Sequence, residues 1–272
     1  MINQYPLTDL YTAEYEVRHT GKINGKTAEI FTMLGYRRQW SSTTFQGDIA
    51  TYLVGGQQKF NTPAVGTTYY INSTSVQDAT GGSGVDRLRI SYLDSTGAAQ
   101  TVDANLNGTT AVSIGSGFTF IQMMESWHST TDDREAAGNI TISSINGVAT
   151  EATTMEMIRS GGNRSRSASY KVPTGKHAHL IDYHVSTAKL GASATYEVNA
   201  RALVFNDSAD GIATSYHFLK GVMMVDGAQH TDEFHYKELP AGSIVKLSVI
   251  PSSAADGNVV TCSLDMIVMD GD

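Results

Sequence analysis

Alternation of apolar and polar residues with a period of two recurs along this chain and constrains its fold more than any other feature. In the segment Leu88–Tyr92, apolar side chains at every second position alternate with Arg89 and Ser91. Successive side chains of a β-strand point to opposite faces, so this pattern predicts a strand with one buried face. A longer alternation runs through residues 194–204, and further copies follow up to residue 268. Repeated short strands of this kind are typical of β-sandwiches and jelly rolls.

The stretch 81–115 contains three such strands in succession and predicts an antiparallel meander. Its second turn contains Asn107 and Gly108, which suggests a two-residue hairpin loop. That loop would place residues of opposite parity across from each other. A three-residue loop ending in a left-handed Gly108 instead places Val102 opposite Val112, and we favour it.

Composition agrees with an all-β fold. Charged residues make up only 17% of the chain and prolines number 5, whereas glycine reaches 26, a balance that suits strands joined by tight turns. The length allows two hydrophobic cores. We therefore expect two β-sandwich or jelly-roll-like domains, residues 26–172 and 173–272, preceded by an extended N-terminal arm, residues 1–25. Proline in the segment 171–175 would fix the turn between the domains.

The N-terminal arm carries aromatic and apolar side chains without sustained periodicity. A chain terminus is disordered unless it is tied down, so one interpretation is a partly disordered tail. The other is an arm that docks on a neighbouring subunit. Its contact residues would be Tyr5, Leu10, Tyr11 and Tyr15.

Several classes of function are disfavoured by the sequence. The net charge of -8 argues against binding nucleic acid through phosphate contacts. No apolar run is long enough to cross a membrane, and the first residues do not resemble a secretory signal. The lone Cys262 cannot form an internal disulfide, and its place on an apolar strand face predicts a core residue.

Catalytic residues are not indicated. The chain has no G-x-S-x-G motif, and we predict neither enzymatic activity nor a cofactor. His177 and His179 would point to the same face of one strand, so a third ligand on a neighbouring strand would complete a metal site. Histidines at surfaces are commoner than metal ligands, and we therefore predict no metal.

Two groups of residues are candidate binding contacts. The loop 160–167 is rich in glycine, serine and arginine but lacks the lysine and helix of a phosphate-binding loop. We expect it to form an assembly contact through Arg159, Arg164 and Arg166. An alternative is a host-glycan surface built from exposed aromatic side chains, for which the candidates are Trp40, Tyr69 and Trp127.

The order of several short motifs resembles a family of virion structural proteins encoded by tailed bacteriophages, especially marine and aquatic ones. The motifs are Val85–Asp94, Leu106–Val112, Gly138–Ile142 and Tyr170–Lys176, with supporting matches at Tyr36–Trp40 and Leu264–Val268. The resemblance spans roughly residues 35–270. It implies a β-rich virion component and supplies no catalytic residues.

We therefore expect a capsid decoration or cement protein. It would be located in the virion, which is assembled in the host cytoplasm. Its partners would be the major capsid protein or other virion proteins. We expect a homo-oligomer, with a trimer suggested by the symmetry of a phage shell. The alternatives are a tail or head-fibre module that binds host glycan and, third, a glycan-cleaving enzyme. A place at the neck or tail stays open at this point.

Overall fold

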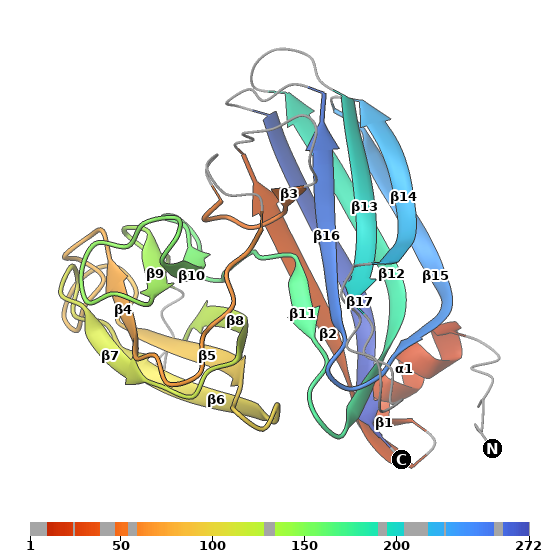
Figure 1. The fold of residues 1–272 in the computed structure, drawn as a ribbon, viewed down its shortest axis with the longest axis horizontal. Coiled ribbons are helices and arrows are strands. Elements are labelled where there is room, and N and C mark those ends of the chain that lie inside the picture. The colour runs from red at the N-terminus through yellow and green to blue at the C-terminus, as the bar shows by residue number, and fades with distance from the viewer. Residues whose placement is uncertain are drawn as a thin grey trace.

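The computed structural model describes residues 10–23, 25–38, 47–53, 59–127, 134–189, 195–203, 217–225, 227–252 and 258–271. Within these residues the regular secondary structure consists of β-strands and one helix, α1 (Leu10–Thr20). Four sheets pack in pairs as two sandwiches that lie side by side (Figure 1). The predicted all-β sandwich architecture is confirmed.

The larger sandwich, which we call the main sandwich, contains both ends of the described chain. One sheet has the order β1 (Lys22–Ile23), β2 (Lys26–Arg37), β17 (Asn258–Asp270), β12 (Lys176–Lys189), β15 (Gln229–Leu239). The other has the order β11 (Ser169–Lys171), β16 (Ile244–Pro251), β13 (Thr195–Leu203), β14 (His217–Val225), and β3 (Gly47–Asp48) pairs with β16. The two sheets share one hydrophobic core.

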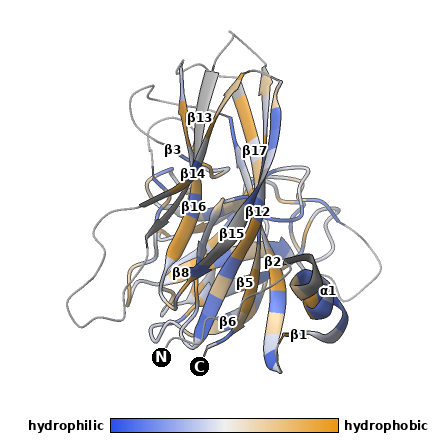
Figure 2. Cartoon of the chain, turned by 90° about the vertical axis from the view of Figure 1, so that its right-hand side faces the viewer, coloured by the Kyte–Doolittle hydropathy of each residue, from blue (hydrophilic) through white to orange (hydrophobic). Residues whose placement is uncertain are grey.

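Strand β17 shows how the sequence pattern produces this core. Every second residue from Val260 to Val268 faces the interior, while the residues between them face the other way. Figure 2 shows the same alternation of hydrophobic and hydrophilic residues along the strands. Cys262 is a core residue, as predicted, and burial raises the pKa of its thiol far above the ordinary value. Opposite it, Gly35 leaves room for the sulfur, because a Cβ there would lie 2.5 Å from Sγ.

The smaller sandwich, which we call the inserted sandwich, is formed by the chain between β3 and β11. One of its sheets has the order β10 (Thr154–Ile158), β9 (Ile140–Ser143), β4 (Tyr69–Ser73), β7 (Val112–Gly115). The other has the order β6 (Ala99–Asn105), β5 (Arg87–Leu93), β8 (Phe120–Ser126). A second hydrophobic core lies between them.

Strand pairing differs from the division of the chain that the sequence suggested. That division grouped residues 26–172 in one unit, but β2 pairs with β17 from Ala28 opposite Met269 to Arg37 opposite Val260. Strands β3 and β11 also join the main sandwich. The alternation of apolar and polar residues indicates which face of a strand is buried, but it does not indicate which strand lies beside it. This long-range pairing could therefore not be predicted from the pattern.

The predicted meander is correct in its first hairpin and wrong in its second. Strands β5 and β6 pair as expected, with Ile90 opposite Val102. Strand β7 pairs with β4 in the other sheet, so Val102 and Val112 are not partners. Gly108 is left-handed as predicted, with φ +57°, but its N–H donates to the carbonyl of Asp78 and its carbonyl accepts from Ser73. These bonds hold the turn at which the chain passes from β6 in one sheet to β7 in the other.

Residues 10–20 form a helix where the sequence predicted an extended arm. Ala13 and Val17, one turn apart, pack on the outer face of the main sandwich in a small apolar cluster. The helix ends at Gly21, whose left-handed backbone lets its N–H reach the carbonyl of Val17. In the described part of the chain, no helix has the length and apolar character needed to span a membrane.

Candidate functional site: an arginine-lined pocket between the sandwiches

Segment 163–174 holds the inserted sandwich against the main sandwich. Backbone hydrogen bonds join Ser165 to Met124, Ser126 to Asn163 and Thr174 to Gly97, with lengths of 2.8, 2.7 and 2.8 Å. Side-chain bonds of Gln122 to the backbone of Lys171 add to them. Because these bonds involve β8 and the β5–β6 turn, they fix the position of the loop that leads into this segment and overlaps its first residues.

That loop, residues 159–166, is bonded on both sides. Its turn has a left-handed Gly161, whose N–H donates to the carbonyl of Ala136, and the N–H of Ala136 donates to Gly162. At its other end the carbonyl of Arg166 accepts the N–H of Tyr36 from β2. The loop therefore runs between the two sandwiches in a defined conformation.

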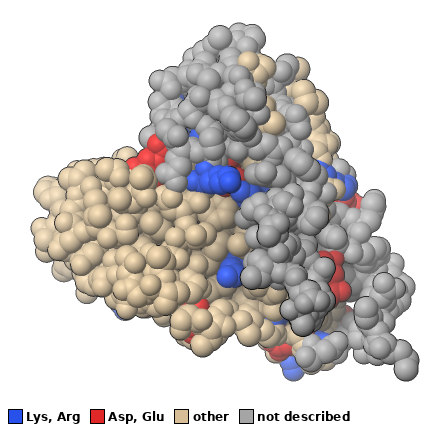
Figure 3. Space-filling view, viewed as in Figure 1, with Lys and Arg blue, Asp and Glu red and all other residues tan. Residues whose placement is uncertain are grey.

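The loop forms one side of a pocket of about 130 Å³. The pocket brings together all three arginines that the sequence suggested as assembly contacts. Its lining residues are Tyr36, Thr51, Arg159, Ser160, Gly161, Gly162, Arg164 and Arg166. Figure 3 shows Lys and Arg side chains gathered where the two sandwiches meet. This local basic character stands out in a chain whose net charge is -8.

The three guanidinium groups are held differently. Arg159 donates to the hydroxyl of Tyr36 at 2.8 Å and lies over its ring at 5.3 Å. Arg164 donates to the carbonyl of Thr32 at 2.8 Å, while its buried Nε finds no hydrogen-bond partner within the described part of the chain. Arg166 is exposed. Among the described residues none of the three forms an ion pair.

Electrostatics make this pocket suited to a small anion. Burial lowers the pKa of Arg164, and the charge of Glu125 opposes that effect; a guanidinium still remains protonated at neutral pH. The volume is far below the roughly 300–1,000 Å³ of sites for drug-sized ligands. A carboxylate, which a guanidinium binds through paired N–H groups, fits this size and charge.

A buried ion pair lies where β2, β3 and β16 meet, and sequence reasoning missed it. Nζ of Lys246 lies 2.7 Å from a carboxylate oxygen of Asp48, and both side chains are 2% exposed. Arg37, also buried, donates to the carbonyl of Asp48 at 2.8 Å. Burial lowers the pKa of Arg37 to about 10, although the charge of Asp48 raises it. Since these groups are enclosed, their role is to join the strands.

Glu156 on β10 is a second buried charge that the sequence analysis did not single out. Its carboxylate accepts the hydroxyl of Ser167 at 2.7 Å and the N–H of Met157 at 2.9 Å. Burial raises its pKa from 4.5 to about 7, while these hydrogen bonds lower it. The signal was present in the sequence, because Glu156 stands between two methionines in an apolar strand.

Of the aromatic residues suggested for glycan binding, the two that the structure describes, Tyr69 and Trp127, do not form a common exposed surface. Tyr69 is buried, with 1% exposure, and its ring packs edge-on to Phe118. The guanidinium of Arg89 covers one face of the Trp127 ring at 3.3 Å. Trp40 lies outside the described residues. The proposal of Tyr69 as a glycan contact is therefore wrong, because an enclosed ring cannot stack on a sugar.

The contacts proposed for the N-terminal arm are only partly described. Tyr5 lies outside the described residues, and Leu10 and Tyr11 belong to α1. Tyr15 is 64% exposed and stacks on His19 with ring centroids 3.9 Å apart. Tyr15 is thus accessible on the outer side of the helix.

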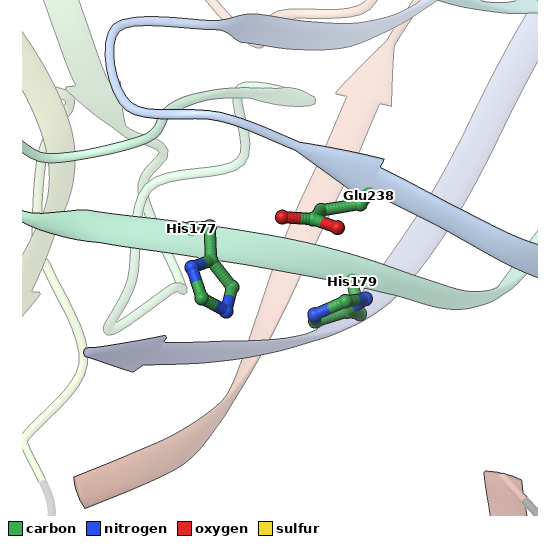
Figure 4. A group of neighbouring side chains, drawn as sticks. All are labelled: His177, His179 and Glu238. Carbon is green, nitrogen blue, oxygen red and sulfur yellow. The ribbon is translucent and has the colours of Figure 1, made fainter. Parts of the chain in front are cut away.

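His177 and His179 point to the same face of β12, as their spacing predicted (Figure 4). The neighbouring group on the adjacent strand is Glu238 of β15. One donor atom from each of the three side chains lies within 4.8 Å of the others. Two imidazoles and a carboxylate could together hold a metal ion.

Comparisons with known proteins leave the family unassigned. No protein-family model matches the chain, and no curated protein matches its sequence. A solved structure of the T13 particle of infectious bursal disease virus is similar at 11% identity and a TM-score of 0.26, over 90% of this chain and 69% of that chain. The tandem CBM22 domains of Paenibacillus barcinonensis Xyn10C are similar at 9% identity and a TM-score of 0.25, over 92% and 100%. Similarities at this level do not define a shared fold.

Proposed function

We propose that this protein is a structural component of a tailed-phage virion, a decoration or cement protein of the head that acts as a homo-oligomer. The arginine-lined pocket carries the proposal, since it offers a neighbouring protein cationic groups that form no ion pair with any described residue. The order of the family-like motifs along residues 35–270 supports the same assignment. In this function the chain binds other virion proteins and catalyses no reaction.

The ligand of the pocket, on this proposal, is a carboxylate side chain of the major capsid protein. Arg159 and Arg166 are exposed and can reach a partner, while Arg164 is half buried at the base of the loop. A charge-assisted hydrogen bond to a buried guanidinium is among the stronger contacts in an interface. The proposal therefore expects the interface to depend on these arginines more than on other surface cations.

Co-sedimentation with capsids that lack the protein tests this function. Wild-type protein is expected to bind the capsids, and Arg166→Glu and Arg159→Ser are each expected to weaken binding at least about tenfold. The matched control is Arg87→Ser, which removes a partly exposed charge on β5 of the inserted sandwich, 3.4 Å from the carboxylate of Asp103. Because Arg159 and Arg166 are exposed and Arg87 is partly exposed, circular dichroism should show an unchanged fold.

Two outcomes would contradict the proposal. Failure of the wild-type protein to bind capsids at any concentration would remove the assembly function. Equal weakening by Arg87→Ser and Arg159→Ser, which remove the same charge, would mean that overall charge, rather than the pocket, governs binding. Binding to host glycan by protein that does not bind capsids would favour the glycan-binding alternative.

A further inference from the structure

The strand β12 carries two histidines whose positions are set by the core of the main sandwich. Between and after them, Ala178 and Leu180 are fully buried against the opposite sheet. The backbone therefore cannot rotate without exposing apolar core, and His177 and His179 stay on the outer face. The two imidazole rings lie 5.3 Å apart, nearly perpendicular to one another.

The antiparallel register brings a carboxylate to the same place. Glu238 on β15 is directly opposite His179, and side chains directly opposite on one face of a sheet are close neighbours. Figure 4 shows the Glu238 carboxylate beside both rings. The three donor atoms come from two hydrogen-bonded strands and lie within 4.8 Å of one another.

From this arrangement we infer that His177, His179 and Glu238 bind a divalent transition-metal ion of the zinc class. Two imidazole nitrogens and a single carboxylate match the ligands of zinc. The same set is poor for calcium, which takes six to eight oxygen ligands. Three protein ligands leave a fourth tetrahedral position for water.

The distances need only a small adjustment to hold the ion. With bonds of about 2.0–2.2 Å, tetrahedral ligand atoms lie about 3.3–3.6 Å apart. Glu238 is exposed, so its side chain can turn toward the rings without disturbing the core, and both histidines are partly exposed, so an ion can enter from solvent.

Metal titration of untagged, chelator-treated protein tests the inference, with Zn²⁺ as the probe. We expect one ion per chain by calorimetry and by elemental analysis after desalting. X-ray absorption at the zinc edge should show two imidazole ligands at about 2.0–2.1 Å. Zn²⁺ at one hundred times its dissociation constant should raise the melting temperature by roughly 5–10 °C.

Matched variants locate the ion. His177→Gln, His179→Gln and Glu238→Gln are each expected to weaken zinc binding at least about tenfold. The control His184→Gln removes another histidine of β12, one that is hydrogen-bonded to Thr231 at 2.8 Å, and should bind zinc like the wild type. Because Glu238 is exposed, Glu238→Gln should fold even if a histidine variant does not.

The inference fails if Glu238→Gln and His179→Gln bind zinc as tightly as the wild type. It also fails if His184→Gln loses the ion to the same extent, or if saturating zinc gives less than one ion per chain. In any of these cases the two histidines and the glutamate would be neighbouring surface side chains that do not bind zinc. The capsid-binding test of the assembly function does not involve these residues, so either proposal can fail without the other.

Discussion

Replacing Glu156 by glutamine tests the reasoning about buried charge most sharply. The carboxyl is enclosed, and burial raises its pKa to about 7 in the folded protein, against 4.5 as the ordinary value. The folded state therefore holds the proton more tightly than the unfolded state does. Between pH 4.5 and 7 the unfolded chain loses this proton first, so the free energy of unfolding falls as the pH rises through that window.

The size of the effect follows from the difference between the two pKa values. A difference of about 2.5 corresponds to about 3 kcal/mol, reached once the pH exceeds about 7. Glutamine stays neutral at every pH and keeps an oxygen that can accept from Ser167. Glu156→Gln should therefore equal the wild type near pH 4.5 and be more stable by up to about 3 kcal/mol at pH 8.

Urea denaturation at pH 5 and pH 8 measures this difference directly. The comparison of variant and wild type at the same pH cancels the contribution of every other titrating group that is not coupled to Glu156. Burial raises the pKa of neighbouring Tyr52 well above 10, so its hydroxyl does not titrate in this range. Glu135→Gln, at an exposed position, is the control and should show no such dependence. A stability difference that is the same at both pH values would refute the reasoning.

Three further substitutions test the packing and the buried polar contacts, with the free energy of unfolding as the measurement. Lys246→Met removes the cation from the ion pair with Asp48 and should cost about 3 kcal/mol, so a loss below 1 kcal/mol would count against that contact. Asp78→Ala should cost about 3–5 kcal/mol because three backbone N–H groups and a hydroxyl lose their acceptor, whereas Asp78→Asn should lose less. Gly35→Ala should cost about 1–3 kcal/mol because its Cβ would lie 2.5 Å from Sγ of Cys262. Adding Cys262→Ala should restore part of that loss, and a fully additive double variant would contradict the steric explanation.

The sequence predicted those features that depend on local pattern. The period-two alternation placed Cys262 in the core and predicted that the first two strands of the meander pair. It also predicted that His177 and His179 share one strand face. It also brought the arginines of one loop together as candidates, because residues close in the chain remain close in the fold. The sequence predicted a contact loop that contains Arg159, Arg164 and Arg166. It did not predict that their side chains line one pocket.

Features that depend on distant partners could not be read from the pattern. The alternation of β2 fits either sandwich, and only its pairing with β17 decides where it belongs. Glu238 reaches the histidines through the register of β15 with β12. The helix α1 was missed because its apolar pattern is short; among the helix residues whose burial is described, Ala13 and Val17 are buried. Its place on the main sandwich supplies the burial that a short helix needs.

The central claim is that this chain is a head-bound structural protein that contacts its neighbours through the arginine-lined pocket. An asymmetric cryo-electron microscopy reconstruction of the virion tests this most directly. We expect copies of the two sandwiches on the capsid shell, with density from the major capsid protein against Arg159 and Arg166. Density confined to the tail tip, or a pocket that faces solvent in every copy on the head, would contradict it.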